Sequence, residues 1–251
     1  MRNDELLSAK DLVIGNNGIA LTRDINFSIT SGECILLCGA NGTGKSTLLR
    51  TIAGLIPSIS GSFGSRKTNI MIVPARIPKV KGFTTMEFIA TSCYRDSDWI
   101  GRLKAKDKAN ILNAMRDIGI ENLYERDIES LSDGEFQKAA IASAIVQKAD
   151  VILLDEPTAF LDVDSRENVM SVIHDMVSTH KISVIFSSHD ISSTLHHCNR
   201  VFGLTNNHLE GDSNEGLIHF LDSGPNATDE TKKLILSKCF LSFRTSFEMI
   251  E

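Results

Sequence analysis

Short apolar runs alternate along this chain with segments that have helical spacing. The runs are CILLCG (34–39), NIMIVP (69–74), VILLDE (151–156), SVIFSSH (183–189) and RVFGLTN (200–206). Nearly continuous apolar runs of this length are typical of strands buried on both faces. Between them, KSTLLRTIAGL (45–55) and SRENVMSVIHDMVSTH (165–180) are expected to be helices. The alternation predicts an α/β fold with a mainly parallel sheet covered by helices.

Two regions depart from that alternation. Residues 11–30 predict an antiparallel β region, with strands at 11–15 and 20–30 joined by the turn Asn16-Asn17-Gly18. From Thr84 to about Leu123 the spacing is helical without a strand candidate, and Thr84 or Thr85 is expected to cap the first helix. This block resembles a helical subdomain inserted into the α/β core.

The chain therefore reads as one domain of 251 residues. We expect residues 1–79 and 149–206 to form the core and residues 80–148 the helical subdomain. Residues 207–251 are expected to be a tail that is polar and then helical.

Composition narrows the functional classes. Lys and Arg number 26 against 32 Asp and Glu, so the formal net charge is −6 and a nucleic-acid partner is not expected. The polar N-terminus does not resemble a signal peptide, and no apolar run reaches the ~18 residues that span a membrane. A function at a membrane would need a partner.

The five cysteines form no CxxC pair and are expected to be reduced thiols, with Cys34 and Cys38 packing in a strand rather than binding a metal.

The strongest chemical signal is GANGTGKS (39–46), which fits G-x-x-x-x-G-K-[ST] between a predicted strand and a predicted helix. In such a P-loop, glycines let backbone N–H groups face phosphate oxygens at a helix N-terminus. Lys45 can then reach the β- and γ-phosphates of a nucleotide, and Ser46 can ligate Mg²⁺. The expected nucleotide-binding residues of this loop are Gly39, Asn41, Gly42, Gly44, Lys45, Ser46 and Thr47.

A second signal lies at the end of VILLDE (151–156). The apolar strand carries Asp155 to the edge of the sheet where the phosphates would lie, so Asp155 is expected to hold Mg²⁺ together with Ser46. Glu156 is expected to orient or deprotonate the attacking water. Adjacent strand residues point to opposite sides, so the two acids are given different roles.

A third signal is SSHD (187–190), which follows the next apolar run. His189 is expected to reach the γ-phosphate. Alone, this residue could as well be an ordinary surface or packed histidine. Its position after the strand that follows VILLDE favours the functional interpretation.

The order GANGTGKST, LSDGE, VILLDEPT, FLD and SSHD resembles the ATP-binding subunits of ABC transporters up to about residue 205. The resemblance implies a P-loop NTPase (RecA-like) core that binds ATP and Mg²⁺ and hydrolyses ATP. It also implies a head-to-tail homodimer, in which Ser132 and Gly134 of one subunit's signature cover the ATP held by the other. Leu161 and Asp162 match the D-loop, which crosses that interface.

A narrower resemblance concerns the transporter class. TTMEFIA, GRLKAKD and LSDGE are similar to segments of importer ATPases for iron–siderophore, haem and cobalamin complexes. This implies integral membrane permease subunits as partners, a substrate-binding protein as an indirect one, and a location on the cytoplasmic face of the membrane. An exporter ATPase would share every catalytic motif. A non-transport ABC protein remains a further alternative, although such proteins usually carry two cassettes or long coiled-coil insertions.

The chain departs from the family pattern at three places. Asn16 or Asn17 stands where an aromatic residue usually stacks on adenine, which predicts weaker ATP binding or weaker base preference. Ala75, followed by Arg76, stands at the glutamine position of the Q-loop. The signature carries Asp133 and Glu135, and a carboxylate ~4 Å from a phosphate charge would be repelled by about 4 kcal/mol. Both acids are therefore expected to point away from the phosphate.

Overall fold

A six-stranded sheet forms the centre of the molecule, with strand order β11-β10-β5-β9-β8-β7. The computed structural model describes residues 5–22, 24–65, 67–96, 103–205 and 208–210. All neighbouring strands of this sheet run parallel except β10 and β11, which are antiparallel. The strands are β5 (Cys34–Cys38), β7 (Ile70–Val73), β8 (Val151–Leu154), β9 (Ser183–Ser187), β10 (Arg200–Thr205) and β11 (His208–Glu210).

A second, antiparallel sheet lies beside the core with the order β4-β1-β6. Its strands are β1 (Glu5–Val13), β4 (Ile25–Thr30) and β6 (Ser60–Ser65), and a small hairpin joins β2 (Gly15–Asn16) to β3 (Ile19–Ala20). The expected turn at residues 16–18 is present, with Asn17 and Gly18 at positive φ.

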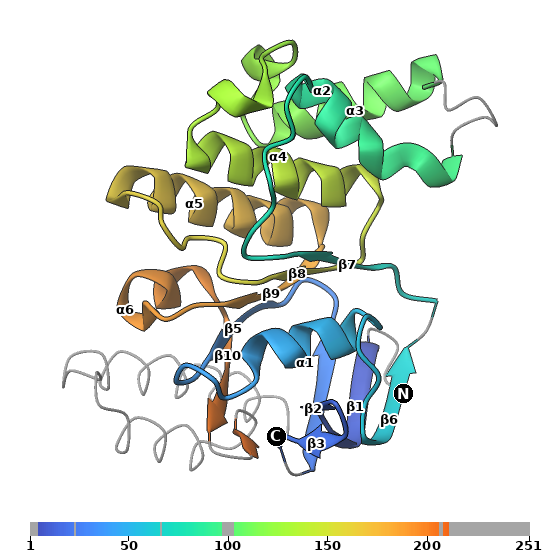
Figure 1. Ribbon diagram of the computed structural model, residues 1–251, viewed down its shortest axis with the longest axis vertical. Coiled ribbons are helices and arrows are strands. Elements are labelled where there is room, and N and C mark those ends of the chain that lie inside the picture. Colours follow the sequence, from blue (N-terminus) through green and yellow to red (C-terminus); the bar gives the residue numbers. More distant parts are fainter. Residues whose placement is uncertain (1–4, 23, 66, 97–102, 206–207, 211–251) are drawn as a thin grey trace, which may run out of the picture.

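The helices form layers on both faces of the central sheet (Figure 1). On one face α1 lies between the central sheet and the antiparallel sheet; on the other, α5 separates the central sheet from a lobe of α2, α3 and α4. The helices are α1 (Lys45–Ile52), α2 (Thr85–Ala90), α3 (Ala105–Asp117), α4 (Asp133–Val146), α5 (Val163–His180) and α6 (Ile191–Thr194). Short 3-10 turns are η1 (Thr91–Asp96), η2 (Glu121–Leu123), η3 (Ile128–Ser130) and η4 (Leu195–His197).

Strand β5 shows why the central runs are apolar throughout. All five of its residues are buried. Ile35 and Leu37 pack on the side of α1, whereas Cys34, Leu36 and Cys38 pack on the side of α5 and the helical lobe. Because side chains alternate between faces and both faces are covered, a polar residue has no solvent-facing place on this strand.

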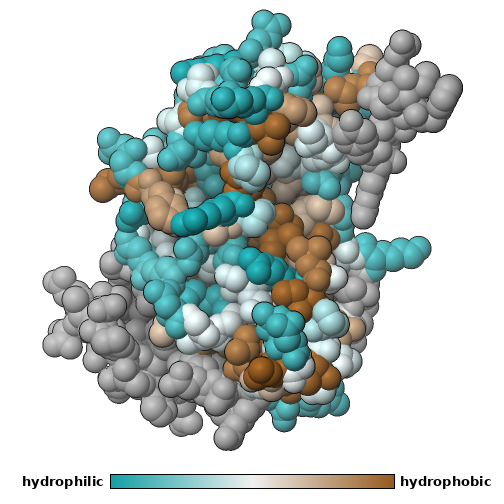
Figure 2. Space-filling view, viewed as in Figure 1, coloured by the Kyte–Doolittle hydropathy of each residue, from teal (hydrophilic) through white to brown (hydrophobic). Residues whose placement is uncertain are grey.

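The surface differs between the two halves of the molecule. Figure 2 shows a largely hydrophilic helical lobe and hydrophobic side chains gathered lower on the same face, over α1 and the antiparallel sheet. Among the described residues, no helix is both long enough and apolar enough to cross a membrane.

The fold class is the expected one, but several element boundaries differ. The strand expected at 11–15 is the end of β1, which begins at Glu5 and is interrupted by irregular pairing near Asp11. Strand β6 was not expected, because SGSFGS carries one large apolar residue and is a strand through its pairing with β1. The helical block contains the short α2 and η1 before α3. Residues 208–210 of the expected tail form a strand, and residues 211–251 lie outside the described residues.

Candidate functional site

The loop between β5 and α1 has the backbone that its glycines allow. Gly39, Gly42 and Gly44 have φ values of 155°, 82° and 103°, in the region that side chains with a Cβ rarely adopt. A Cβ on Gly39 would lie 2.4 Å from the Leu204 carbonyl oxygen, so β10 also leaves no room for one. Helix α1 begins at Lys45 directly after Gly44, which places the helix N-terminus at the loop.

Lys45 curls back over this loop. Its Nζ donates hydrogen bonds to the carbonyl oxygens of Gly39 at 2.8 Å and Ala40 at 3.0 Å, and the residue is buried. Burial lowers the pKa of the ammonium group, while the Glu156 and Asp155 carboxylates nearby oppose that shift. The cation therefore lies against the P-loop, where it also feels the charges of the two acids that follow β8.

Asp155 lies next to the P-loop. Its Oδ1 accepts hydrogen bonds from Ser46 Oγ at 3.0 Å and from Ser187 Oγ at 2.9 Å. This arrangement follows from the sheet order, because β9 lies between β5 and β8 and the three strands end at the same edge. Asp155 is buried, so its carboxylate is held rather than free in solvent.

Glu156 and His189 also meet. Glu156 Oε1 lies 2.5 Å from His189 Nε2, and both side chains are partly exposed. Glu156 has a φ of 51° and its N–H donates to Ser187 Oγ at 2.8 Å. The sharp turn after β8 directs the side chain away from that of Asp155, toward the histidine that follows β9.

The signature residues lie elsewhere, at the start of α4. Ser132 caps this helix by accepting from Glu135 N at 3.2 Å, and Glu135 Oε2 accepts from Ser132 N at 2.8 Å. Within the described ranges, no hydrogen bond joins Ser132 or Gly134 to residues 39–47. A Cβ on Gly134 would lie 3.0 Å from Ser165 Cβ, so the glycine lets α4 approach the start of α5.

Asp162 caps α5. Its carboxylate accepts from Ser165 N at 2.8 Å and Ser165 Oγ at 2.9 Å, and these hydrogen bonds lower the pKa of the Asp162 carboxyl. The D-loop and the signature are therefore packed together at one end of the helical lobe, apart from the P-loop of the same chain.

Comparison with known proteins now identifies the family. The family model described as ABC transporter matches residues 22–159, more than half of the chain. The chain belongs to the ABC transporter ATP-binding family. Members of this family bind ATP with Mg²⁺ and hydrolyse it to power transport, and this chain is therefore an ATPase.

Individual relatives agree with that assignment. The petrobactin import ATP-binding protein FpuD of Bacillus anthracis is 28% identical over 79% of this chain and 77% of its own. The high-affinity zinc uptake ATP-binding protein ZnuC of Bacillus subtilis is 31% identical, and the match covers 74% of this chain and 84% of ZnuC. A structure described as a metal-chelate type ABC transporter superposes with a TM-score of 0.78 at 24% identity, covering 85% and 88%. A dimeric ATP-binding cassette with ADP and Pi superposes with a TM-score of 0.68 at 21% identity, and the match covers 82% of this chain and 97% of the cassette.

The side chains present in this ABC ATPase suit a magnesium nucleotide. Ser46 and Asp155 place a hydroxyl and a carboxylate oxygen together, and Mg²⁺ prefers oxygen ligands of this kind. The P-loop offers backbone N–H groups at a helix N-terminus with a lysine beside them, which suits phosphate groups.

The departure at the signature, its two acids, has a structural answer. Asp133 Oδ1 lies 3.0 Å from Lys79 Nζ, which also donates to the Leu131 carbonyl at 2.7 Å. Glu135 Oε1 lies 3.4 Å from Arg126 Nη1. Both acids of the signature are thus engaged by cations of their own subunit.

The Q-loop departure has a different outcome. Ala75 offers no side chain to the site, and the Arg76 guanidinium lies 5.5 Å from the centre of the Phe160 ring. Arg76 thus contacts the residue next to the D-loop, a cation–π arrangement. Asn16 is exposed on the β2–β3 hairpin and presents no aromatic face.

Sequence reasoning missed several residues that organise the site. Ser187 contacts both acids after β8, Lys79 and Arg126 engage the signature acids, and Arg166 Nη1 lies 2.5 Å from Asp190 Oδ2. Ser187 and Asp190 belong to the SSHD motif, so these two residues had a local signal. The others depend on contacts between segments distant in sequence.

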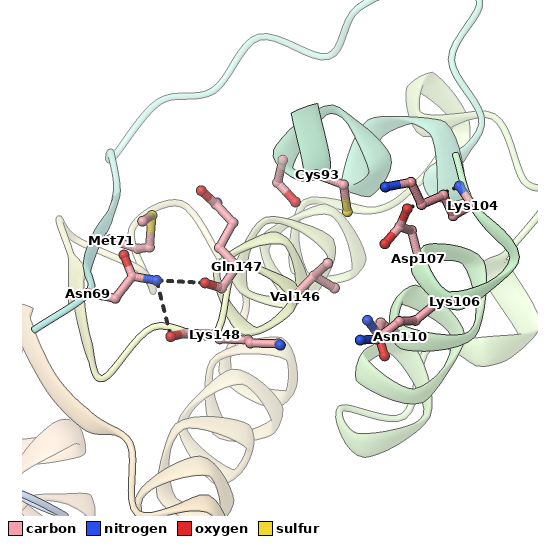
Figure 3. A pocket seen from close by; sticks show the side chains of 11 residues that line it. Asn69, Met71, Cys93, Lys104, Lys106, Asp107, Asn110, Val146, Gln147 and Lys148 are labelled. Carbon is pink, nitrogen blue, oxygen red and sulfur yellow. Dashed lines mark hydrogen bonds between the residues drawn. The ribbon is translucent and has the colours of Figure 1, made fainter. Parts of the chain in front are cut away.

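A cavity of about 480 Å³ lies away from these residues, between α3 and the edge strand β7 (Figure 3). One wall carries Asn69, whose Nδ2 donates to the carbonyl oxygens of Gln147 at 2.6 Å and Lys148 at 3.1 Å. The opposite wall carries polar residues of α3, including Asp107 and Asn110. None of the sequence-predicted site residues lines this cavity.

Proposed function

We propose that this ABC ATPase powers an importer, with an iron–siderophore, haem or cobalamin complex as its cargo. One curated relative is named for petrobactin import and another for siderophore transport, which supports this class. Others are named for zinc and for phosphonates. The proposed cargo class therefore rests on the less specific motifs TTMEFIA, GRLKAKD and LSDGE.

The catalytic assignment rests on two separate side-chain contacts made by the acids that follow β8. Asp155 shares a hydrogen bond with Ser46, while Glu156 contacts His189. In our proposal, Ser46 and Asp155 hold Mg²⁺, which would neutralise phosphate charge when bound. Lys45 binds the β- and γ-phosphates. The remaining P-loop contacts come from Gly39, Asn41, Gly42, Gly44 and Thr47.

Glu156 is proposed to orient the attacking water and accept its proton at a carboxylate oxygen. His189 is proposed to contact the γ-phosphate and, through its contact with Glu156, to keep that carboxylate in place. Both side chains are partly exposed, so each is accessible to water and nucleotide.

Ser132, Gly134 and Asp162 are proposed to act on the nucleotide of a second copy of the chain. Their position apart from the P-loop of their own subunit supports this arrangement. With Asp133 and Glu135 engaged by Lys79 and Arg126, the Ser132 hydroxyl and the backbone N–H at Gly134 are left as the groups that suit a phosphate.

The helical lobe is proposed to transmit dimer closure to permease subunits at the cytoplasmic face of the membrane, with a substrate-binding protein acting indirectly. The cavity between α3 and β7 supports a contact with the permease at this place. It lies where the helical lobe meets the core, and its shape would change if the lobe moved relative to the core. Purification with a multi-span permease would favour a transporter over a non-transport ABC protein. Vesicle uptake, as opposed to extrusion, would separate importer from exporter.

Replacing the proposed water-orienting residue tests the catalytic assignment. Glu156→Gln keeps the size of the side chain but removes the proton acceptor, so we expect turnover to fall by at least ~10²-fold while ATP stays bound. Phosphate release and equilibrium ATP binding measure the two effects.

Glu121→Gln, an exposed change in η2, is the matched control and should behave as wild type. Full hydrolysis by Glu156→Gln would exclude the proposed role.

A further inference from the structure

Ser187 is a fully buried hydroxyl at the end of β9, with 0% of its surface exposed. Strand β9 runs parallel to β8 with Phe186 aligned to Leu154, so Ser187 comes beside the turn that starts at Asp155. Its hydroxyl donates to Asp155 Oδ1 at 2.9 Å and accepts from Glu156 N at 2.8 Å. One side chain therefore contacts both proposed catalytic acids.

The contact to Glu156 matters because of the backbone there. Glu156 has a φ of 51°, a left-handed conformation that residues with a side chain rarely adopt. Ser187 Oγ accepts the N–H at this turn, which would otherwise lack a partner in a partly buried place. The direction of the Glu156 side chain toward His189 depends on this turn.

The contact to Asp155 matters because its Oδ1 accepts from two hydroxyls, and only one of them is proposed to bind Mg²⁺. Ser46 Oγ donates to the same Asp155 Oδ1 that Ser187 contacts, and it is also the hydroxyl proposed to ligate Mg²⁺. A hydroxyl can donate its hydrogen to a carboxylate and still offer a lone pair to a metal, so Ser46 can keep this hydrogen bond while it ligates Mg²⁺. Ser187 is then a second donor to the same carboxylate oxygen, and it is the one whose hydroxyl has no proposed role at the metal.

We propose that Ser187 is a positioning residue, which holds the Asp155 carboxylate for Mg²⁺ and the turn at Glu156 for the attack of water. This inference rests on the roles proposed above for Asp155 and Glu156. Ser187 itself touches neither metal nor nucleotide in this proposal, since its single hydroxyl hydrogen and an acceptor lone pair are already engaged by the two acids.

The same strand supplies a matched control. Ser183, at the other end of β9, is also fully buried. Its hydroxyl donates to the Thr30 carbonyl at 2.7 Å and accepts from Gly32 N at 3.0 Å. Ser183→Ala and Ser187→Ala therefore remove the same kind of hydrogen bonds from the same strand, one far from the proposed site and one within it.

The experiment uses the full chain and measures binding of the non-hydrolysable analogue AMP-PNP, once with EDTA and once with excess Mg²⁺. We expect Mg²⁺ to tighten binding to the wild type. In Ser187→Ala, the factor by which Mg²⁺ tightens AMP-PNP binding should be smaller by about tenfold. The affinity measured in EDTA should stay within about twofold of the wild-type value. Its kcat should fall by a similar factor at nearly constant KM.

Ser183→Ala should lower the Tm about as much as Ser187→Ala. Its kcat and the tightening of AMP-PNP binding by Mg²⁺ should stay at the wild-type values. Ser187→Thr, which retains the hydroxyl, should restore most of both. If Ser187→Ala keeps the Mg²⁺ gain and kcat, the hydroxyl only satisfies buried groups and the inference is wrong. If the wild type gains nothing from Mg²⁺, the metal assignment to Ser46 and Asp155 fails as well.

Discussion

Single residues explain how an acidic signature can face a phosphate. Asp133 is 68% exposed and lies beside Lys79, while Glu135 closes the cap of α4 and contacts Arg126. Exposed ion pairs of this kind contribute at most ~1 kcal/mol to stability. Their proposed importance is directional, because a carboxylate held by a cation of its own subunit would be kept from the position where it would repel a nucleotide.

Asn16 is the residue whose replacement should change base recognition. It stands exposed on the β2–β3 hairpin without an aromatic face. We expect wild-type ATP and GTP affinities to differ by less than about threefold, and Asn16→Tyr to tighten ATP binding roughly fivefold through stacking of ~1 kcal/mol. Fluorescence titration with both nucleotides measures this, and Asn16→Ala serves as control. Tight adenine-selective binding by the wild type would contradict the expectation.

At the scale of elements, two helices of the lobe begin with the same capping box. Thr84 and Glu87 start α2, and Ser132 and Glu135 start α4, each pair with reciprocal hydrogen bonds between side chains and backbone. A capping box satisfies N–H groups that a helix cannot satisfy internally. The beginning of α4 is therefore a well-formed helix start in its own right, and its use toward a phosphate is an added role.

The two caps allow structure and function to be separated. Thr84→Ala and Ser132→Ala should each reduce the free energy of unfolding by about 1 kcal/mol, because each loses one capping hydrogen bond. Only Ser132→Ala should also lower ATPase activity, since Thr84 is not proposed to meet nucleotide. Chemical denaturation and phosphate release measure the two quantities. Equal activity of both variants would remove Ser132 from the proposed site.

At the scale of the whole molecule, the proposed site is divided between two places on one chain. The P-loop lies at one edge of the central sheet, whereas the signature and the D-loop lie where α4 meets α5 (Figure 1). Phe160 and Val163, on either side of the D-loop residues, are 75% and 72% exposed. Large apolar residues beside a proposed interface suit a surface that a second copy covers.

Dimer formation is the test at this scale. With ATP and Mg²⁺, Glu156→Gln should sediment at twice the 27.5 kDa of one chain, because nucleotide stays bound between the copies. Adding Val163→Asp should weaken the dimer at least tenfold by burying a charge. Leu55→Asp, at a residue 66% exposed and away from the D-loop, should not. A monomer under all conditions would contradict the head-to-tail arrangement.

Much of the fold could be predicted because the signals are local. Strands β5, β8 and β9 are apolar throughout since both faces of their sheet are covered, and the P-loop needs glycine at fixed positions. Residues 5–10 of β1 and all of β6 escaped prediction. Their residues carry little β pattern, and their strand conformation comes from pairing between segments: β1 pairs with β4 and also with β6, which lies more than forty residues away.

The sequence by itself determined the kind of chemistry, through the spacing of Gly39 to Ser46 and the acids after β8, because those demands lie within a few residues. Tertiary structure alone decided which groups hold that chemistry in place. Ser187 reaches Asp155, Lys79 reaches Asp133, and Arg166 reaches Asp190 because strand order and helix packing bring them together. A hydrogen bond between distant segments leaves no period in the sequence, so only the folded chain could reveal it.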